Sequence, residues 1–308
     1  MKIFKHRGDI YISKSDYTKS SRETKILMAL LMVIVAVTLV FVVMLSQKYS
    51  SVAQFFADGK VTTSQVQNAD DTVLPKVSGK TNYLIIETDD NKKTVHYLYL
   101  LQADKDNLAY KISVLSPKMD INGSTPNEII NEGGGALLQS KLAEYFGFEI
   151  DYYAQFETNK FVQFANKLGN FVYISPREIK YDVKSEDDAY ALHISEGEQI
   201  IDGKQLSDLI RYYSNDDLNL TAANEAMLYA ITELFNTENF NDCEALFKLF
   251  IHCSSTNITV RDFEKGKDAL QVFCYKNTDI TIYSSTPQYD GDVLTQDSMQ
   301  DIKGYFNK

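Results

Sequence analysis

Residues 151–176 read DYYAQFETNKFVQFANKLGNFVYISP, and this stretch decides the fold class. Within it, the apolar residues of 159–168 recur at helical spacing and stop before Gly169, a residue suited to the left-handed end of a helix. The next run, 171–175, is rich in β-branched and aromatic residues and ends before Pro176. The stretch therefore predicts a helix that leads into a strand.

The same alternation continues on both sides of this stretch. Strands are predicted over 83–86, 95–101 and 110–115, helices over 136–146, 203–213, 221–235 and 242–252, and a last αβ stretch over 260–269, 270–275 and 280–283. The first of these helices ends at Gly147, again a favoured helix-terminating residue. Strands that interleave with helices predict an α/β fold, a mixed β-sheet flanked by helices on both faces.

An apolar segment precedes this domain. Residues 26–45, ILMALLMVIVAVTLVFVVML, form a run of 20 residues in which Thr38 is the one polar side chain. As a helix this run is about 30 Å long, the thickness of the hydrocarbon core of a bilayer. A cleavable signal peptide is the alternative, since the small residues Ser51 and Ala53 follow, but its apolar stretch is normally shorter. The run predicts a single transmembrane helix.

The charges around this helix predict its orientation. Residues 1–25 contain seven basic and three acidic residues, so the positive-inside rule places this tail in the cytoplasm. Residues 46–80 lack periodicity and are rich in polar residues, which is typical of a stalk. We therefore expect a protein anchored in the plasma membrane, in contact with its lipid through 26–45, with 81–308 folded outside as one domain.

Composition excludes several function classes. The chain has 31 basic and 42 acidic residues and a net charge of -11, which disfavours nucleic acid as a partner. Three cysteines without a CxxC pattern argue against a zinc or redox motif. They are interpreted as small core residues, with a bond between Cys253 and Cys274 as an alternative. Gly133 to Gly135 precede a predicted helix and are either a turn or an anion-binding backbone segment.

Five patterns, with 151–176 among them, carry a family resemblance. They are 82–89 (NYLIIETD), similar to N-hhhhGTD; 111–120 (KISVLSPKMD), similar to KVSLLSIPRD; 133–147 (GGGALLQSKLAEYFG), a helix that opens with GG; 151–176; and 203–211 (GKQLSDLIR), similar to GeqALxYvR. In this order they resemble the LytR-CpsA-Psr (LCP) family of cell-wall polymer transferases. The resemblance covers about residues 80–250.

The resemblance implies a fold and a chemistry. It implies an α/β sheet with an apolar channel for a polyprenyl chain, whose pyrophosphate is held by arginines and by Mg²⁺ on two acids. Such enzymes transfer a glycan phosphate from the lipid carrier to peptidoglycan. The implied partners are therefore a polyprenyl-linked glycan or peptidoglycan, and other wall-assembly proteins.

Several motif positions depart from this pattern. The first metal acid is kept as Asp89, but His96 and Tyr97 stand where the second acid is expected. Met119 replaces the arginine of PRD. Arg211 is kept as the first arginine of the later pair. Downstream, 217–224 (DLNLTAAN) has no arginine, and the side chains that phosphate contacts require are thus mostly absent.

The resemblance assigns candidate roles to the residues that remain. Arg211 is a phosphate contact or the partner of a salt bridge, and Lys118 can substitute as a cation. Asp89 is a metal ligand or the start of an Asx turn. The remaining candidates, for substrate binding, are Asp120 (with a turn as its alternative), Tyr213 and Asp217.

Three functions stay open at this point. The leading hypothesis is an envelope protein that binds a polyprenyl-linked or wall glycan and has little or no transferase activity. The alternatives are an active phosphotransferase with a rebuilt clamp, and a scaffold without a ligand. An open apolar channel that ends at Asp89 and Arg211 would favour the first two, and a collapsed core would favour the scaffold.

Overall fold

The computed structural model describes residues 73–92, 94–183, 190–216 and 218–307. The chain divides into two units, Met1–Asp70 and Asp71–Lys308, of which the first lies wholly outside the described residues. The predicted cytoplasmic tail, the predicted transmembrane helix and residues 46–72 of the predicted stalk therefore lie outside them too. Within the described part, no helix combines the length and the apolar character needed to cross a bilayer.

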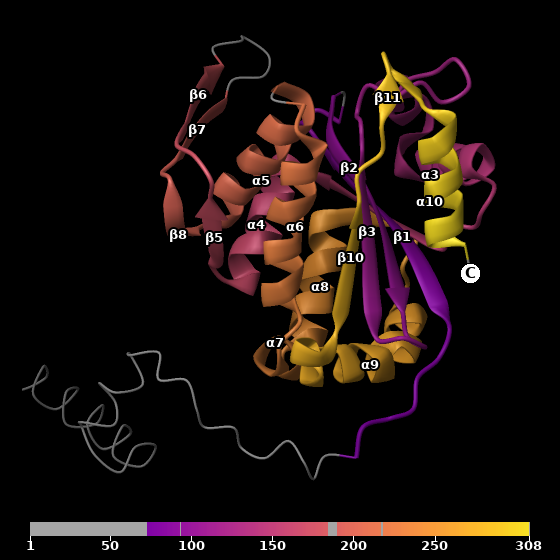
Figure 1. Cartoon of the computed structure of the whole chain (residues 1–308). Coiled ribbons are helices and arrows are strands. Elements are labelled where there is room, and N and C mark those ends of the chain that lie inside the picture. Colours follow the sequence, from indigo (N-terminus) through magenta and orange to yellow (C-terminus); the bar gives the residue numbers. More distant parts are fainter. Residues whose placement is uncertain (1–72, 93, 184–189, 217, 308) are drawn as a thin grey trace, which may run out of the picture. The chain divides into compact units, whose positions relative to one another are not determined.

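A six-stranded mixed sheet forms the centre of the second unit (Figure 1). Its strand order is β10-β3-β2-β1-β4-β9. The strands are β1 (Lys80–Thr88), β2 (Val95–Asp104), β3 (Ala109–Leu115), β4 (Tyr152–Glu157), β9 (Ser254–Thr256) and β10 (Thr281–Ser285). The strand pairs β1/β2, β2/β3 and β4/β9 are antiparallel, and β1/β4 and β3/β10 are parallel. The predicted mixed sheet is confirmed.

Helices cover both faces of the sheet (Figure 1). On one face lie α3 (Pro126–Phe146) and α10 (Gln296–Phe306), and on the other lie α4 (Thr158–Leu168), α5 (Gly203–Arg211), α6 (Leu220–Leu234) and α8 (Cys243–Cys253). The remaining helices are α7 (Thr237–Asn241) and α9 (Val260–Tyr275), with the short turns η2 (Tyr212–Asp216) and η3 (Asn277–Asp279). Almost every side chain of β2 is buried, as a strand covered on both faces requires.

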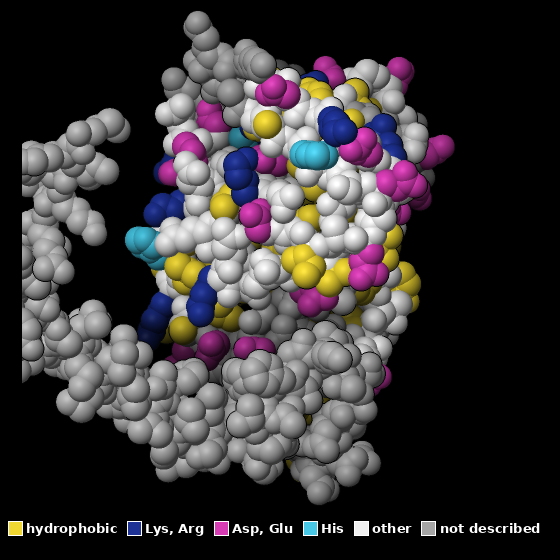
Figure 2. Space-filling view, turned by 90° about the vertical axis from the view of Figure 1, so that its left-hand side faces the viewer, with side chains coloured by type: hydrophobic (Ala, Val, Ile, Leu, Met, Phe, Trp, Pro, Cys, Tyr) yellow, Lys and Arg dark blue, Asp and Glu magenta, His cyan; other side chains and the backbone are white. Residues whose placement is uncertain are grey.

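Three two-stranded sheets lie outside the central one. They are β5 (Phe171–Ser175) with β8 (Gly197–Ile201), β6 (Ile179–Val183) with β7 (Tyr190–Ile194), and β11 (Tyr289–Asp290) with β12 (Val293–Leu294). The predicted strand 171–175 thus forms, but it pairs with β8 rather than with the central sheet. On the face drawn in Figure 2, acidic and basic side chains are interspersed among hydrophobic ones.

Helix α3 begins ten residues earlier than predicted. Thr125 and Glu128 form a capping box at its start, and Gly147 ends it in the left-handed conformation. The helix breaks at Gly134, whose φ is +66°. The N–H of Gly135 donates to Oε1 of Gln155 at 2.8 Å, so the glycine run is a helix break and this N–H is not available to an anion.

Two further predictions meet different outcomes. The expected change from helix to strand near residue 270 is wrong, because α9 continues to Tyr275 and buries Val272 and Phe273 along one side. The three cysteines are buried and free, so Cys253 and Cys274 form no disulfide bond and the interpretation as small core residues is confirmed.

Candidate functional site

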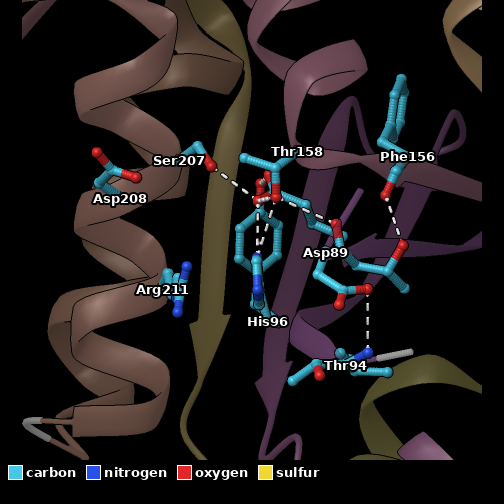
Figure 3. A network of polar contacts seen from close by, with 12 residues as sticks. Asp89, Thr94, His96, Phe156, Thr158, Ser207, Asp208 and Arg211 are labelled. Carbon is cyan, nitrogen blue, oxygen red and sulfur yellow. Dashed lines mark hydrogen bonds and ion pairs between the residues drawn. The ribbon is translucent and has the colours of Figure 1, made fainter. Parts of the chain in front are cut away.

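A buried carboxylate, Glu87, lies at the centre of the candidate site, and Figure 3 labels three residues that contact it, His96, Thr158 and Ser207. Its Oε1 accepts hydrogen bonds from the hydroxyl groups of Ser207 at 2.7 Å and Thr158 at 3.0 Å, and Nδ1 of His96 lies 3.4 Å away. Its Oε2 accepts a hydrogen bond from the hydroxyl group of Tyr97. The side chain of Glu87 is fully buried, and this set of donors replaces the water it has lost.

Four elements bring these residues together. Glu87 and Tyr97 are directly paired across β1 and β2, so their side chains lie on the same face of the sheet. Thr158 is the first residue of α4, and Ser207 lies in the middle of α5. The Thr158 hydroxyl group also lies 3.1 Å from the carbonyl oxygen of Thr88 and 3.1 Å from Nδ1 of His96. We call Glu87, His96, Tyr97, Thr158 and Ser207 the Glu87 network.

The Glu87 network keeps its tyrosine neutral. Burial, and then the negative charge of Glu87, raise the pKa of Tyr97 well above its ordinary value of 10.0. The phenol therefore remains a donor at neutral pH. Because Ser207 and Thr158 are neutral donors as well, the carboxylate is stabilised mainly by hydrogen bonds rather than by an arginine or lysine.

Sequence reasoning missed Glu87, although a signal was present. In the resemblance of 82–89 to the pattern N-hhhhGTD, Glu87 stands at the glycine. Where a glycine leaves space beside the strand, this chain has a carboxylate with its donors. Thr158 and Ser207 gave no comparable signal, since both lie in ordinary helical patterns.

Asp89 closes the turn between β1 and β2. Its N–H donates to the carbonyl oxygen of Thr94 at 2.9 Å, and its Oδ1 accepts a hydrogen bond from the N–H of Thr94 at 3.2 Å. His96 and Tyr97 occupy the positions of the second acid, and the described residues contain no group of three or more acidic, histidine or cysteine side chains that could hold a metal ion. The residues present therefore do not fit the Mg²⁺ site that the resemblance implies.

Arg211, the last residue of α5, is mostly buried. Its guanidinium group lies 3.9 Å from the centre of the Tyr190 ring. One turn earlier, Asp208 pairs with Lys204. Burial raises the pKa of Asp208, whereas Lys204 and, more weakly, Arg211 lower it. Arg211 therefore lies against an aromatic ring and near the carboxylate of Asp208, and its phosphate contact stays a prediction.

The turn that follows Arg211 redirects the next side chains. Residues Tyr212–Asp216 form a π-helix, a geometry that is rare outside functional or irregular positions. Tyr213, at the place of the family's second arginine, is 2% exposed, and its hydroxyl group lies 3.3 Å from that of Tyr173. It therefore belongs to the core rather than to an open substrate surface. Asp217 lies outside the described residues.

The remaining candidates lie at the end of β3. Oδ1 of Asp120 accepts a hydrogen bond from the N–H of Gly123 at 2.6 Å, which is the turn that the sequence offered as its alternative role. Lys118 is exposed, and its Nζ lies 3.4 Å from the carbonyl oxygen of Asn215. Asn215 in turn donates to the carbonyl oxygens of His96 and Arg211. The fold thus brings Lys118 to the turn that follows Arg211.

The space between the sheet and helices α4 and α5 is tightly packed. Tyr97, Tyr99, Leu206, Leu209 and Ile210 are at most 1% exposed there. Two cavities in the described part have volumes of about 520 Å³, between α7, α8 and α9, and about 160 Å³, at the end of β4. Neither is lined by Asp89 or Arg211. This packing corresponds to the collapsed core of the third hypothesis.

Comparison with known proteins places this fold. The LytR_cpsA_psr family matches residues 116–304, and the chain therefore belongs to this family. The fold resembles that of a Eubacterium siraeum protein described as a transcription regulator, with 21% identity, a TM-score of 0.64, and 80% of this chain and 98% of that chain covered. Among the curated proteins, no sequence matches.

Two other solved structures show the same fold. Bacillus subtilis TagV has 15% identity and a TM-score of 0.58, with 74% of this chain and 96% of that chain covered. TagT bound to LI-WTA has 14% identity and a TM-score of 0.53, with 80% of this chain and 92% of that chain covered. At these identities the solved structures show a shared fold alone. The predicted family is confirmed separately, because the LytR_cpsA_psr family matches residues 116–304.

Proposed function

We propose that this chain is a non-catalytic member of the LCP family at the cell envelope. In this proposal residues 26–45 anchor it in the plasma membrane, and the domain outside binds wall glycopolymer without transferring it. The observation that carries the loss of transfer is Glu87, a buried carboxylate within its own network at the glycine position of the first motif. A carboxylate there repels the pyrophosphate that a transfer site must hold.

The kind of ligand follows from the packing and from the relatives. The closely packed side chains beneath α4 and α5 leave little room for a polyprenyl chain inside the domain, so the proposed ligand is the glycan part. TagT, which shares the fold, has been solved with LI-WTA bound. The close packing also fits the scaffold without a ligand. The LI-WTA bound to TagT is the observation that favours a wall-polymer-binding protein over that scaffold, and the co-sedimentation experiment below separates the two.

A transfer assay tests the proposal directly. The full chain, purified in detergent micelles, is incubated with peptidoglycan and a polyprenyl-pyrophosphate-linked glycan that carries a radiolabel, beside a family member with all of its arginines. We expect label on peptidoglycan for the relative and none for this chain. Co-sedimentation of the unlabelled chain with wall fragments that carry glycopolymer is expected. Transfer above background would refute the loss of transferase activity. Absence of co-sedimentation would refute the binding of wall glycopolymer.

One observation favours active transfer as a second candidate. The contact of Lys118 with Asn215 places a lysine beside the turn that follows Arg211, and a rebuilt clamp would need two such cations. If this candidate were correct, the assay would show transfer that falls in both Lys118→Met and Arg211→Ala. Lys141→Met, which removes an exposed lysine of α3, is the matched control.

A further inference from the structure

A small cavity lies at the end of β4, apart from the Glu87 network. Its volume is about 160 Å³, roughly that of five water molecules. It lies where the β1–β2 turn, the end of β4, the start of α4 and the end of α8 meet, and it shares no residue with the Glu87 network. Its lining consists of Lys92, Gln155, Glu157, Lys160, His252, Cys253, Ser254 and Ser255.

The amide of Gln155 is oriented by the break in α3. Gln155 is 7% exposed, and its Oε1 accepts the N–H of Gly135 at 2.8 Å, which identifies this atom as the oxygen. A Cβ atom at Gly135 would lie 2.7 Å from the Tyr153 ring, so the glycine permits the close approach. Within the part of the chain that the structure describes, the Gln155 amino group donates to no residue. This amino group therefore belongs to the cavity lining as a donor that no described residue occupies.

Cationic side chains and hydroxyl groups complete the lining. Lys92, Lys160 and His252 contribute cations or donors, and the carboxylate of Glu157 is already paired with Nζ of Lys92 at 3.0 Å. Ser255 lies directly opposite Gln155 in the β4–β9 pairing, so both side chains lie on one face. The charge of Lys160 lowers the pKa of the Cys253 thiol, against the larger effect of burial that raises it. The positive charge of Lys160 therefore reaches the cavity wall.

We propose that this cavity binds a small oxyanion of the size of phosphate. A surplus of N–H and O–H donors, with one carboxylate already neutralised, selects an acceptor-only ligand. The five heavy atoms of phosphate correspond to the volume. Its source is a phosphate group on a polymer or free phosphate, and the two share this chemistry. The inference does not depend on whether the family's transfer site is active.

Calorimetric titration of the full chain in detergent micelles with inorganic phosphate tests the site. We expect saturable binding that weakens about tenfold or more in Gln155→Glu. This substitution keeps an oxygen for the Gly135 N–H but replaces the free donor with a negative charge, so the melting temperature should stay nearly unchanged. Lys160→Met should also weaken binding, whereas Lys167→Met, on the exposed last turn of the same helix, should leave it unchanged.

Two further arms identify the source. Dimethyl phosphate mimics the phosphodiester of a polymer, and its tighter binding than inorganic phosphate would assign the site to a polymer; the reverse order would assign it to free phosphate. Ring signals of His252 in NMR spectra should shift with either ligand, and those of His193 should not. If neither ligand binds, or if wild type and Gln155→Glu bind phosphate with equal affinity, the proposal is overturned.

Discussion

The strands β1 and β2 carry two buried polar clusters that differ in kind. Near one end, Asn82 and Gln102 are paired across the strands and face α3 and α10; near the other, Glu87 and Tyr97 are paired and face α4 and α5. Glu87 lies five positions after Asn82 in β1, and an odd spacing places the two side chains on opposite faces. The same strand thus has a neutral cluster on one side and an ionisable one on the other.

The neutral cluster fixes the C-terminal helix. Amide nitrogens of Asn82 and Gln102 donate to the carbonyl oxygen of Phe306 at 3.1 and 2.9 Å, and Nζ of Lys111 donates to that of Tyr305 at 2.7 Å. These bonds satisfy carbonyl groups that every helix leaves unpaired at its end. The comparison shows that neutral amide groups are sufficient to satisfy a carbonyl group at the end of a helix. A carboxylate that accepts hydroxyl donors from three other elements instead joins β1 to β2, α4 and α5.

Removal of the Glu87 carboxylate should have the largest effect. In Glu87→Leu, the hydroxyl groups of Tyr97, Ser207 and Thr158 lose a shared acceptor while they remain buried. We expect the free energy of unfolding to fall by about 3–5 kcal/mol, because three buried hydroxyl donors lose their acceptor and each unsatisfied buried donor costs about 1–3 kcal/mol. Urea denaturation of the full chain in micelles, followed by far-UV circular dichroism, measures it. A loss below about 1 kcal/mol would contradict the importance of this network for stability.

A smaller loss is expected at the neutral cluster. Gln102→Leu removes two hydrogen bonds, to Asn82 and to the Phe306 carbonyl oxygen, but Asn82 still donates to the latter. Since Oε1 of Gln102 is itself buried without a partner in the described part, the loss should be about 1–3 kcal/mol. Hydrogen exchange should accelerate in α10 and remain unchanged in α5. Equal acceleration in both helices would mean that the two clusters are not separate.

The effect of pH on stability distinguishes the ionisable cluster from the neutral one. Because the pKa of Tyr97 is raised in the folded state, the unfolded chain loses this proton first as the pH rises. Stability is therefore complete below pH 10 and falls above it, by up to about 1.4 kcal/mol per pH unit for this group. Tyr97→Phe should reduce this slope, and Gln102→Leu should not. Some slope will persist, because the pKa values of Tyr99 and Tyr110 are raised by burial as well.

The sequence predicted those parts that depend on local signals. The ends of α3 at Gly147 and of α4 at Gly169, and the strand 171–175, follow from residues adjacent in the chain. Gly147 has the predicted left-handed conformation, whereas Gly169, with φ +125° and ψ -162°, does not. The run LQVFCY, 270–275, looked like a strand because short apolar runs are ambiguous, yet it extends α9. The strands β4 and β9 were missed, since each is short and is defined by its partners in the sheet.

The candidate site was only partly predictable for the same reason. Arg211 and Asp89 were found from motif positions, but the role of Glu87 depends on Ser207, which lies 120 residues away in the chain. Such a contact arises from the packing of α5 on the sheet and leaves no pattern in the sequence. By contrast, the glycine position of Glu87 in the first motif was visible, and a charged residue at the buried end of a strand is informative.

The smallest effect should come from Thr158, the one member of the Glu87 network at the start of α4. Thr158→Val keeps the shape of the side chain but removes one of the hydroxyl donors to Oε1 of Glu87, while Ser207 still donates to that atom. We expect a loss of about 0.5–1.5 kcal/mol in the free energy of unfolding, the usual value for one hydrogen bond. In Glu87→Leu the same Thr158→Val change should cost less, because its acceptor is already absent; a double-mutant cycle measures the difference. If the two losses simply add, Thr158 acts independently of Glu87, and its contacts with Thr88 and His96 explain its contribution instead.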